Sequence, residues 1–290
     1  IEVGEGNAGV GGDALISAGK STHMSGGSVV LTSGVGTTSS SGSIRLNTAD
    51  AGAAGVSGSV ELTTGQSSSG SSGSVEIRTG TGVNGNGGDI VLAVGTGNVG
   101  AGGDVRIAAG ETTSGDVGGD IKLVSGVSVG TTSGSIDLAT ADAGSAGSSG
   151  AIGLTTGVAT AGNSGVVRLA TGASENGAGG DIELTVGAGT IGDGGSISMT
   201  AGLTEDAVGG SVDITSGVGI QTDSGSISLN TADSGPAGVS GTISLETGAA
   251  KAGDSGRVVL RSGSSETGAG GDVSIEVGEG NAGVGGDALI

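Results

Sequence analysis

One short pattern recurs along the whole chain, and it constrains the fold more than any other feature. Its clearest copy is residues 88–95, Gly-Asp-Ile-Val-Leu-Ala-Val-Gly. A Gly precedes a residue that we call the anchor, which is followed by Val or Ile at plus one in nearly every copy and by Leu, Ile or Met at plus three. Nineteen anchors occur, in steps of 15 or 16 residues, at positions 13, 28, 43, 59, 74, 89, 104, 120, 135, 151, 166, 181, 196, 211, 226, 242, 257, 272 and 287.

The alternation of apolar and polar residues after each anchor predicts an extended strand with one buried face. Every copy has its apolar residues at the same positions, as parallel stacking of successive coils requires. We therefore expect an all-β fold, a parallel β-solenoid (β-helix) of about 18 coils with 15–16 residues each. The Gly-rich half-coil, as at 95–103, predicts a thin, flattened cross-section with positive φ at the corners, and crossover rules favour right-handed winding.

Two longer periods lie on top of the short one. The stretch at 47–52 returns with small changes at 139–144 and at 230–235, which is every six repeats or about 91 residues. Residues 275–290 are identical to residues 1–16. We expect residues 1–290 to be one continuous section of a longer tandem array. Its six-coil modules would lie at approximately 43–134, 135–225 and 226–290, the last continuing into a copy of 1–42.

Composition excludes several classes of protein. The chain has no Phe, Tyr, Trp or Cys and only one His, so it lacks the aromatic area that fills most globular cores and any thiolate metal site or disulfide. Nine Lys and Arg stand against 29 Asp and Glu, a net charge of −20, which argues against nucleic acid and anionic lipid as partners. No apolar run approaches the roughly 18 residues of a membrane span.

Asp occupies several anchors, including three in succession. The candidate calcium ligands are Asp89, Asp104, Asp120, Asp272 and Asp287. Residues 85–89, Gly-Asn-Gly-Gly-Asp, resemble part of the calcium-binding nonapeptide repeat of RTX proteins. That resemblance implies a row of bound calcium ions and makes calcium the one candidate cofactor. The alternative is that anchor Asp and Ser side chains accept hydrogen bonds from turn amides.

Charges at the outward positions predict contacts between consecutive repeats. Glu246, Arg261 and Glu276 occupy plus four in succession, and Arg45 precedes Glu61 at plus two. Such exposed ladders would fix register and add solubility, at about 0–1 kcal/mol per pair.

The pattern contains no arrangement of catalytic groups. His23 stands alone, and no nucleophile, base and orienting acid can be assembled around it. We therefore expect that the protein is not an enzyme. Thr at plus five invites comparison with ice-binding repeats, but the outward residues at plus two and plus four are too irregular to form a flat Thr face.

The repeats resemble the Gly-rich parallel β-solenoid repeats of large extracellular fibre and surface proteins. This resemblance implies a structural protein that forms a stiff, acidic, extracellular or cell-surface filament or stalk. Its partners would be neighbouring copies placed end to end, with lateral bundling or divalent cations as additions. The alternatives are an adhesive or ice-binding module that uses one face of the rod, and a calcium-stabilised surface-layer or secreted repeat protein. A disordered, elastic Gly/Ser-rich chain would not need the regular apolar positions.

Overall fold

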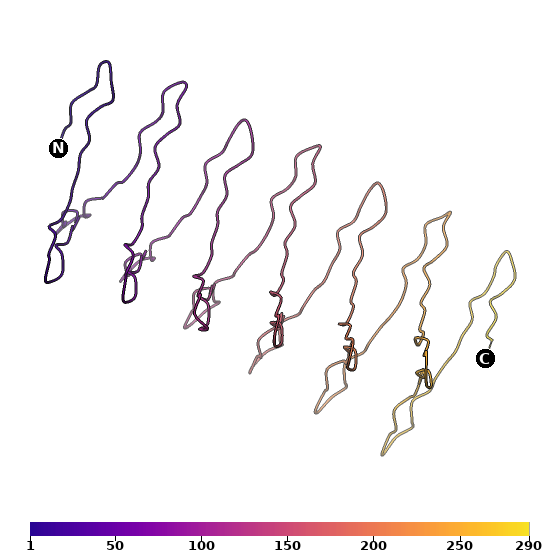
Figure 1. Cartoon of the computed structure of the whole chain (residues 1–290). Helices are drawn as coiled ribbons and strands as arrows, with labels where there is room; N and C mark the ends of the chain where they lie inside the picture. Colours follow the sequence, from indigo (N-terminus) through magenta and orange to yellow (C-terminus); the bar gives the residue numbers. More distant parts are fainter. Residues whose placement is uncertain (290) are drawn as a thin grey trace. The chain divides into compact units, whose positions relative to one another are not determined.

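The computed structural model describes residues 1–289, and within them the chain forms no helix and no β-strand. It consists of extended segments joined by turns, in two units, Ile1–Ala139 and Thr140–Ile290. Each repeat contributes one segment, from the anchor to plus five, and one turn, from the Gly or Ala at plus six to the Gly before the next anchor (Figure 1). The turn bends recur with the period of the sequence, as at 68–70 and 83–85.

The segments keep the predicted period of two. Side chains two residues apart meet on one side of the same segment: the Thr185 hydroxyl donates to Glu183 over 3.0 Å, and the Ser244 hydroxyl donates to Glu246 over 2.6 Å. Ser274 and Glu276 form the same contact over 3.1 Å. The sequence therefore predicted correctly that alternate residues share a face.

Successive segments do not stack on one another. In the first unit the turns at 7–9, 53–54 and 98–100 point to one side, and the two turns between each pair point elsewhere (Figure 1). In the second unit the turns at 145–147, 190–192, 236–237 and 281–283 share a side in the same way. The chain thus returns to a given side only after three repeats, which we call a pass.

The predicted all-β parallel β-solenoid, with its 15–16-residue coils and flattened cross-section, is therefore wrong for this chain. The period was read correctly, but it is the period of a turn and not of a closed coil. A sheet needs the next strand one spacing away, about 4.8 Å, whereas here each turn sends the next segment in a new direction. Among residues 1–289, every backbone hydrogen bond joins residues within nine positions of each other, inside one turn.

At some repeats the Gly before the anchor leaves no room for a side chain. A Cβ added at this position would meet the plus-five side chain on the other side of the turn base, 2.8 Å from Val94 Cγ1 at Gly103 and 2.7 Å from Val186 Cγ1 at Gly195. At Gly88 the same Cβ would lie 3.4 Å from Cβ of Thr79. A side chain is therefore excluded at Gly103 and Gly195, whereas the distance at Gly88 is that of ordinary van der Waals contact.

The size of the plus-five side chain sets how tightly a turn closes. Six repeats with Ala or Ser at plus five have a hydrogen bond of 2.9–3.0 Å across the turn base, from the Gly N–H before the anchor to the Gly carbonyl at plus six. The donors are Gly27, Gly42, Gly119, Gly134, Gly210 and Gly225. Within the described chain, none of the eight repeats with Thr at plus five has this bond. Beside Val3 and Val277 the bond forms but is longer, 3.3 Å from Gly12 to Gly4 and 3.2 Å from Gly286 to Gly278. A β-branched side chain at plus five thus lengthens the bond or prevents it. Among the described residues, Ser262 is the only Ala or Ser at plus five whose repeat lacks the hydrogen bond across the turn base.

The four 16-residue steps place their extra residue in the turn. Three of them form tight turns with a backbone hydrogen bond over three residues, at Gly52–Gly55, Gly144–Gly147 and Gly235–Gly238. Pro236, the only Pro, takes the second position of the third of these turns, where its fixed φ is favoured. Positive φ, predicted for the corner Gly residues, is found at four of the positions four before an anchor: Gly100, Gly162, Gly192 and Gly253.

A reciprocal pair of substitutions tests the control of turn closure. Thr79→Ala is expected to let the Gly88 N–H reach the Gly80 carbonyl, and Ala109→Thr is expected to break the 3.0 Å bond from Gly119 to Gly110. One net hydrogen bond is worth about 1 kcal/mol, so amide exchange should slow about fivefold at Gly88 and accelerate about fivefold at Gly119. Hydrogen-exchange NMR measures both rates, and unchanged exchange at both amides would refute the mechanism.

Candidate functional site

The largest surface feature of the chain is its exposed apolar side chains. No residue between 1 and 289 is buried, and only a few small ones beside the turns are half-buried. At plus one Ile44, Ile90 and Ile136 are 50–52% exposed, and at plus three Leu92 is 74% exposed. A folded chain of 26.2 kDa exposes about 10,600 Å² and its unfolded form about 38,000 Å², whereas this chain exposes 28,421 Å². Most of the surface that a folded protein covers is therefore open.

The backbone of the segments is as open as their side chains. In the described residues, hydrogen bonds between main-chain groups occur at the turns and leave the segments unpaired. An extended backbone with free N–H and C=O groups is a template for another extended chain. Each segment thus offers an apolar face, made by plus one and plus three, and two unpaired edges.

The turns are held by short-range polar contacts. The Ser21 hydroxyl accepts a hydrogen bond of 2.9 Å from the Met24 N–H, and the Ser265 hydroxyl accepts one of 2.9 Å from the Gly268 N–H. Both Ser residues lie seven positions before an anchor, as does Ser128, which accepts from the Thr131 N–H over 3.0 Å. These contacts fix the turns locally and bring no catalytic groups together.

The only His lies in one of these turns. His23 Nδ1 is 2.8 Å from the Thr22 hydroxyl oxygen. No acidic side chain contacts this imidazole within the described part of the chain. The expectation that the protein is not an enzyme stays a prediction.

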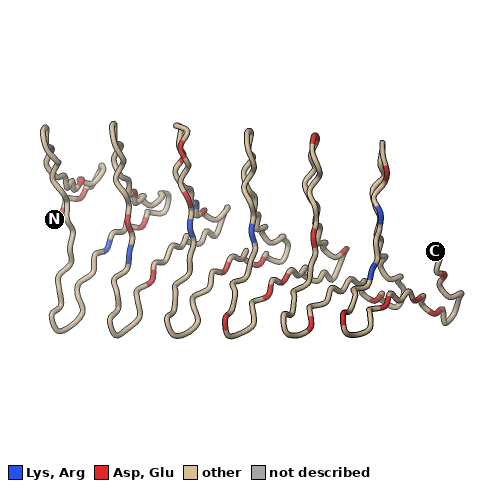
Figure 2. Tube along the Cα trace, turned by 90° about the horizontal axis from the view of Figure 1, so that it is seen from below, with Lys and Arg blue, Asp and Glu red and all other residues tan. Residues whose placement is uncertain are grey.

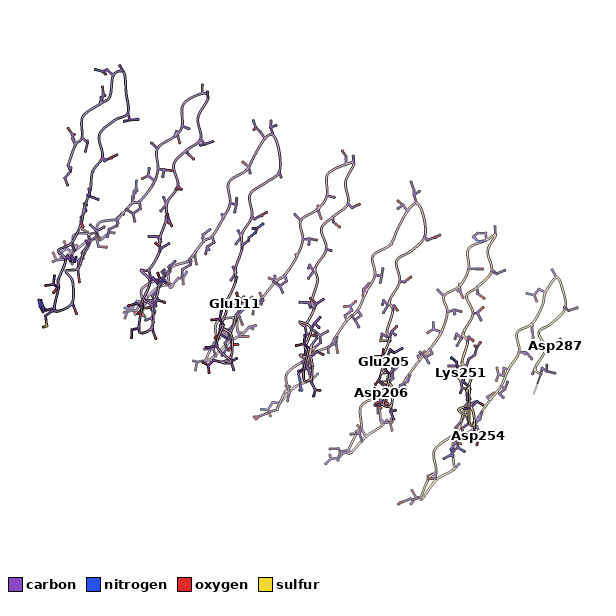
Figure 3. The ribbon with its side chains drawn as sticks, in the orientation of Figure 1. Glu111, Glu205, Asp206, Lys251, Asp254 and Asp287 are labelled. Atoms are coloured by element: carbon purple, nitrogen blue, oxygen red, sulfur yellow. The ribbon has the colours of Figure 1, made fainter. Side chains whose placement is uncertain are left out.

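The candidate calcium ligands lie on separate segments. Asp89, Asp104 and Asp120 begin three successive segments of the first unit. Asp104 accepts a 3.0 Å hydrogen bond from Arg106 on its own segment. Over residues 1–289, no three His, Asp or Glu side chains form a group that could hold a metal ion. Asp272 and Asp287 lie in the second unit, again one repeat apart, with Asp287 following the last turn (Figure 3). Calcium binding stays a prediction.

The predicted ladders of charge between repeats do not form within one chain. The two ion pairs of the described residues, Arg78 with Glu76 and Arg106 with Asp104, each join residues of one segment. Acidic and basic residues are scattered along both units (Figure 2). In the second unit Lys251 and Asp254 occupy one turn, and Glu205 and Asp206 occupy the turn one pass earlier on the same side (Figure 3).

Three further observations complete the description. Residues 1–289 enclose no cavity. The part of the chain that the structure describes has no helix that could cross a membrane. Comparison with protein-family models, with curated proteins and with solved structures finds no match to this chain.

Proposed function

We propose that this chain is a structural protein whose copies assemble into an acidic, extracellular or cell-surface fibre or stalk. One observation carries the proposal: the eighteen repeats that begin at anchors 13 to 272 present exposed apolar residues at the same positions and unpaired backbone, and no residue of 1–289 is buried. Ordering a residue costs about 1–2 kcal/mol of conformational free energy. Burial is the main term that offsets this cost, so the ordered state requires contacts with other molecules.

Copies of the same chain are the partner that best fits the repeats. A surface that recurs every 15 or 16 residues over the whole chain is matched by a partner with the same period, and a further copy has that period by definition. The absence of aromatic residues from the sequence removes the stacking platforms used by many carbohydrate-binding surfaces. The extracellular location rests on the Gly-rich, acidic composition that the chain shares with fibre and surface repeats.

Electron microscopy of the purified chain, combined with light scattering, tests the proposal. We expect unbranched fibres and a particle mass above that of one chain. Because each copy carries a net charge of −20, raising the salt concentration from about 0.01 to 1 M should favour assembly, since the Debye length falls from about 30 to 3 Å. A monodisperse 26.2 kDa species at every salt and protein concentration would overturn the proposal.

A further inference from the structure

We propose that three copies of this chain wind around one another, each advanced by one repeat relative to the next, so that their extended segments pair between chains. This inference rests on the proposed function and names its partner and its register. The order of segments on one side would be repeat n of the first copy, n+1 of the second, n+2 of the third, and then n+3 of the first again.

The number three follows from the length of a pass. Within each unit, one copy presents only every third repeat on a given side (Figure 1). Two repeats are therefore missing from each side between successive passes of the same copy. Two further copies, advanced by one and by two repeats, supply those two repeats on all three sides. The arrangement has closed three-fold symmetry, and every copy has the same surroundings.

The sequence period agrees with this arrangement. Within each unit a lone chain repeats its geometry once per pass, which is 45–46 residues between turns on one side, such as 53–54 and 98–100. The apolar positions nevertheless recur every 15 or 16 residues. Consecutive repeats must therefore be interchangeable, which is the requirement when repeat n lies beside n+1 of another copy.

Surface area argues for an extensive interface. The chain exposes 28,421 Å², which is about 18,000 Å² more than a folded chain of its mass. A stable protein–protein interface buries about 1,600 Å² in total. End-to-end contact between copies covers only the terminal repeats, whereas winding covers the plus-one and plus-three side chains of all of them.

Charge argues for the one-repeat advance and against a blunt register. In a blunt register, in which the copies are aligned without an offset, each charged residue would lie beside the same residue of the neighbouring chain, so that like charges would meet. With a one-repeat advance, opposite charges meet at plus two in Arg45/Glu61, Lys122/Asp137 and Arg168/Glu183, and at plus four Arg261 lies between Glu246 and Glu276. Like charges meet at plus two in Glu61/Glu76 and Arg106/Lys122. At the anchors Arg257 meets Asp272, but the rows Asp89/Asp104/Asp120 and Asp272/Asp287 bring like charges together.

Single cysteines give a direct test, because the sequence contains none. Ser244 and Val259 both occupy plus two, in consecutive repeats, and both are exposed. Ser244→Cys and Val259→Cys chains are refolded from denaturant, alone and together, and treated with a short bismaleimide. We expect covalent dimers from the mixture, little product from either variant alone, and a covalent three-chain species from the variant that carries both cysteines.

The outcomes separate this inference from the proposed function. Efficient cross-linking of Ser244→Cys to itself would indicate a blunt register and overturn the one-repeat advance. Fibres without any cross-link between the two variants would overturn the winding of copies while leaving the fibre function intact. A chain that stays monomeric after refolding would overturn both. Sedimentation equilibrium of the soluble assembly should give three times 26.2 kDa, and a mass of two or four chains would contradict the three-fold arrangement.

Discussion

Replacing Val60 and Val75 by Ser is expected to weaken self-association by two to three orders of magnitude per copy, whereas replacing Val83 and Val99 by Ser leaves it unchanged. Val60 and Val75 occupy plus one of consecutive segments and are 60% and 59% exposed, and Val83 and Val99 lie in turns and are both 89% exposed. Burying a Val side chain is worth about 1.5–2 kcal/mol, so two such changes remove about 3–4 kcal/mol per copy. The substitutions at the turns remove side chains that remain in water.

The two pairs of variants are matched in chemistry and number. In a monomer they would behave alike, because all four side chains are mostly in contact with solvent. The concentration at which light scattering detects assembly measures the difference. Equal effects of the two pairs would show that the segment face is not the surface that associates.

A Cβ at the turn base is expected to cause the second large loss. The double variant Gly103→Ala/Gly195→Ala places two methyl groups 2.8 and 2.7 Å from Val94 Cγ1 and Val186 Cγ1. Overpacking of this kind costs about 1–3 kcal/mol per site, which gives about 2–6 kcal/mol for the pair. The thermal midpoint of the assembled protein, measured by circular dichroism, should fall accordingly.

Two controls belong to this second prediction. Gly95→Ala/Gly187→Ala adds the same atoms at plus six of the same repeats, where nothing lies within 4 Å of the new Cβ, and should leave the midpoint nearly unchanged. Adding Val94→Ala and Val186→Ala to the first variant removes the clashing Cγ1 atoms and should recover part of the loss. A midpoint that falls equally for both Gly pairs would attribute the effect to glycine flexibility instead of the contact.

Much of the local geometry of the chain could be predicted from its amino-acid sequence. The 15–16-residue spacing of the anchors located every turn, and the alternation at plus one and plus three defined which side chains share a face. The Gly-rich half of the repeat was expected to supply positive φ at its corners, and Gly100 and Gly192 have it. These features depend on residues within one repeat, and local steric rules decide them.

The direction in which each segment leaves its turn was decided by the tertiary structure alone. The same alternation, in which Ile90 and Leu92 share a face, fits two different structures. One is a strand that stacks on the next repeat of its own chain, and the other is a segment whose two edges stay unpaired. The two arrangements differ in the path of the backbone through turns such as 83–85 and 98–100. The sequence pattern therefore suggested a closed coil, whereas the chain returns to each side only every third repeat.

The candidate site was predictable to the same extent. Sequence reasoning identified the apolar positions and the charges that distinguish consecutive repeats, such as Glu246 and Arg261, but assigned both to contacts within one chain. The structure leaves these side chains exposed, and within the described residues neither Glu246 nor Arg261 forms an ion pair. Periodicity specifies which residues of consecutive repeats can lie side by side. It does not specify whether the two repeats belong to the same molecule, because the spacing of apolar residues is identical in both cases. That choice depends on the path of the backbone between turns, which only the three-dimensional structure defines.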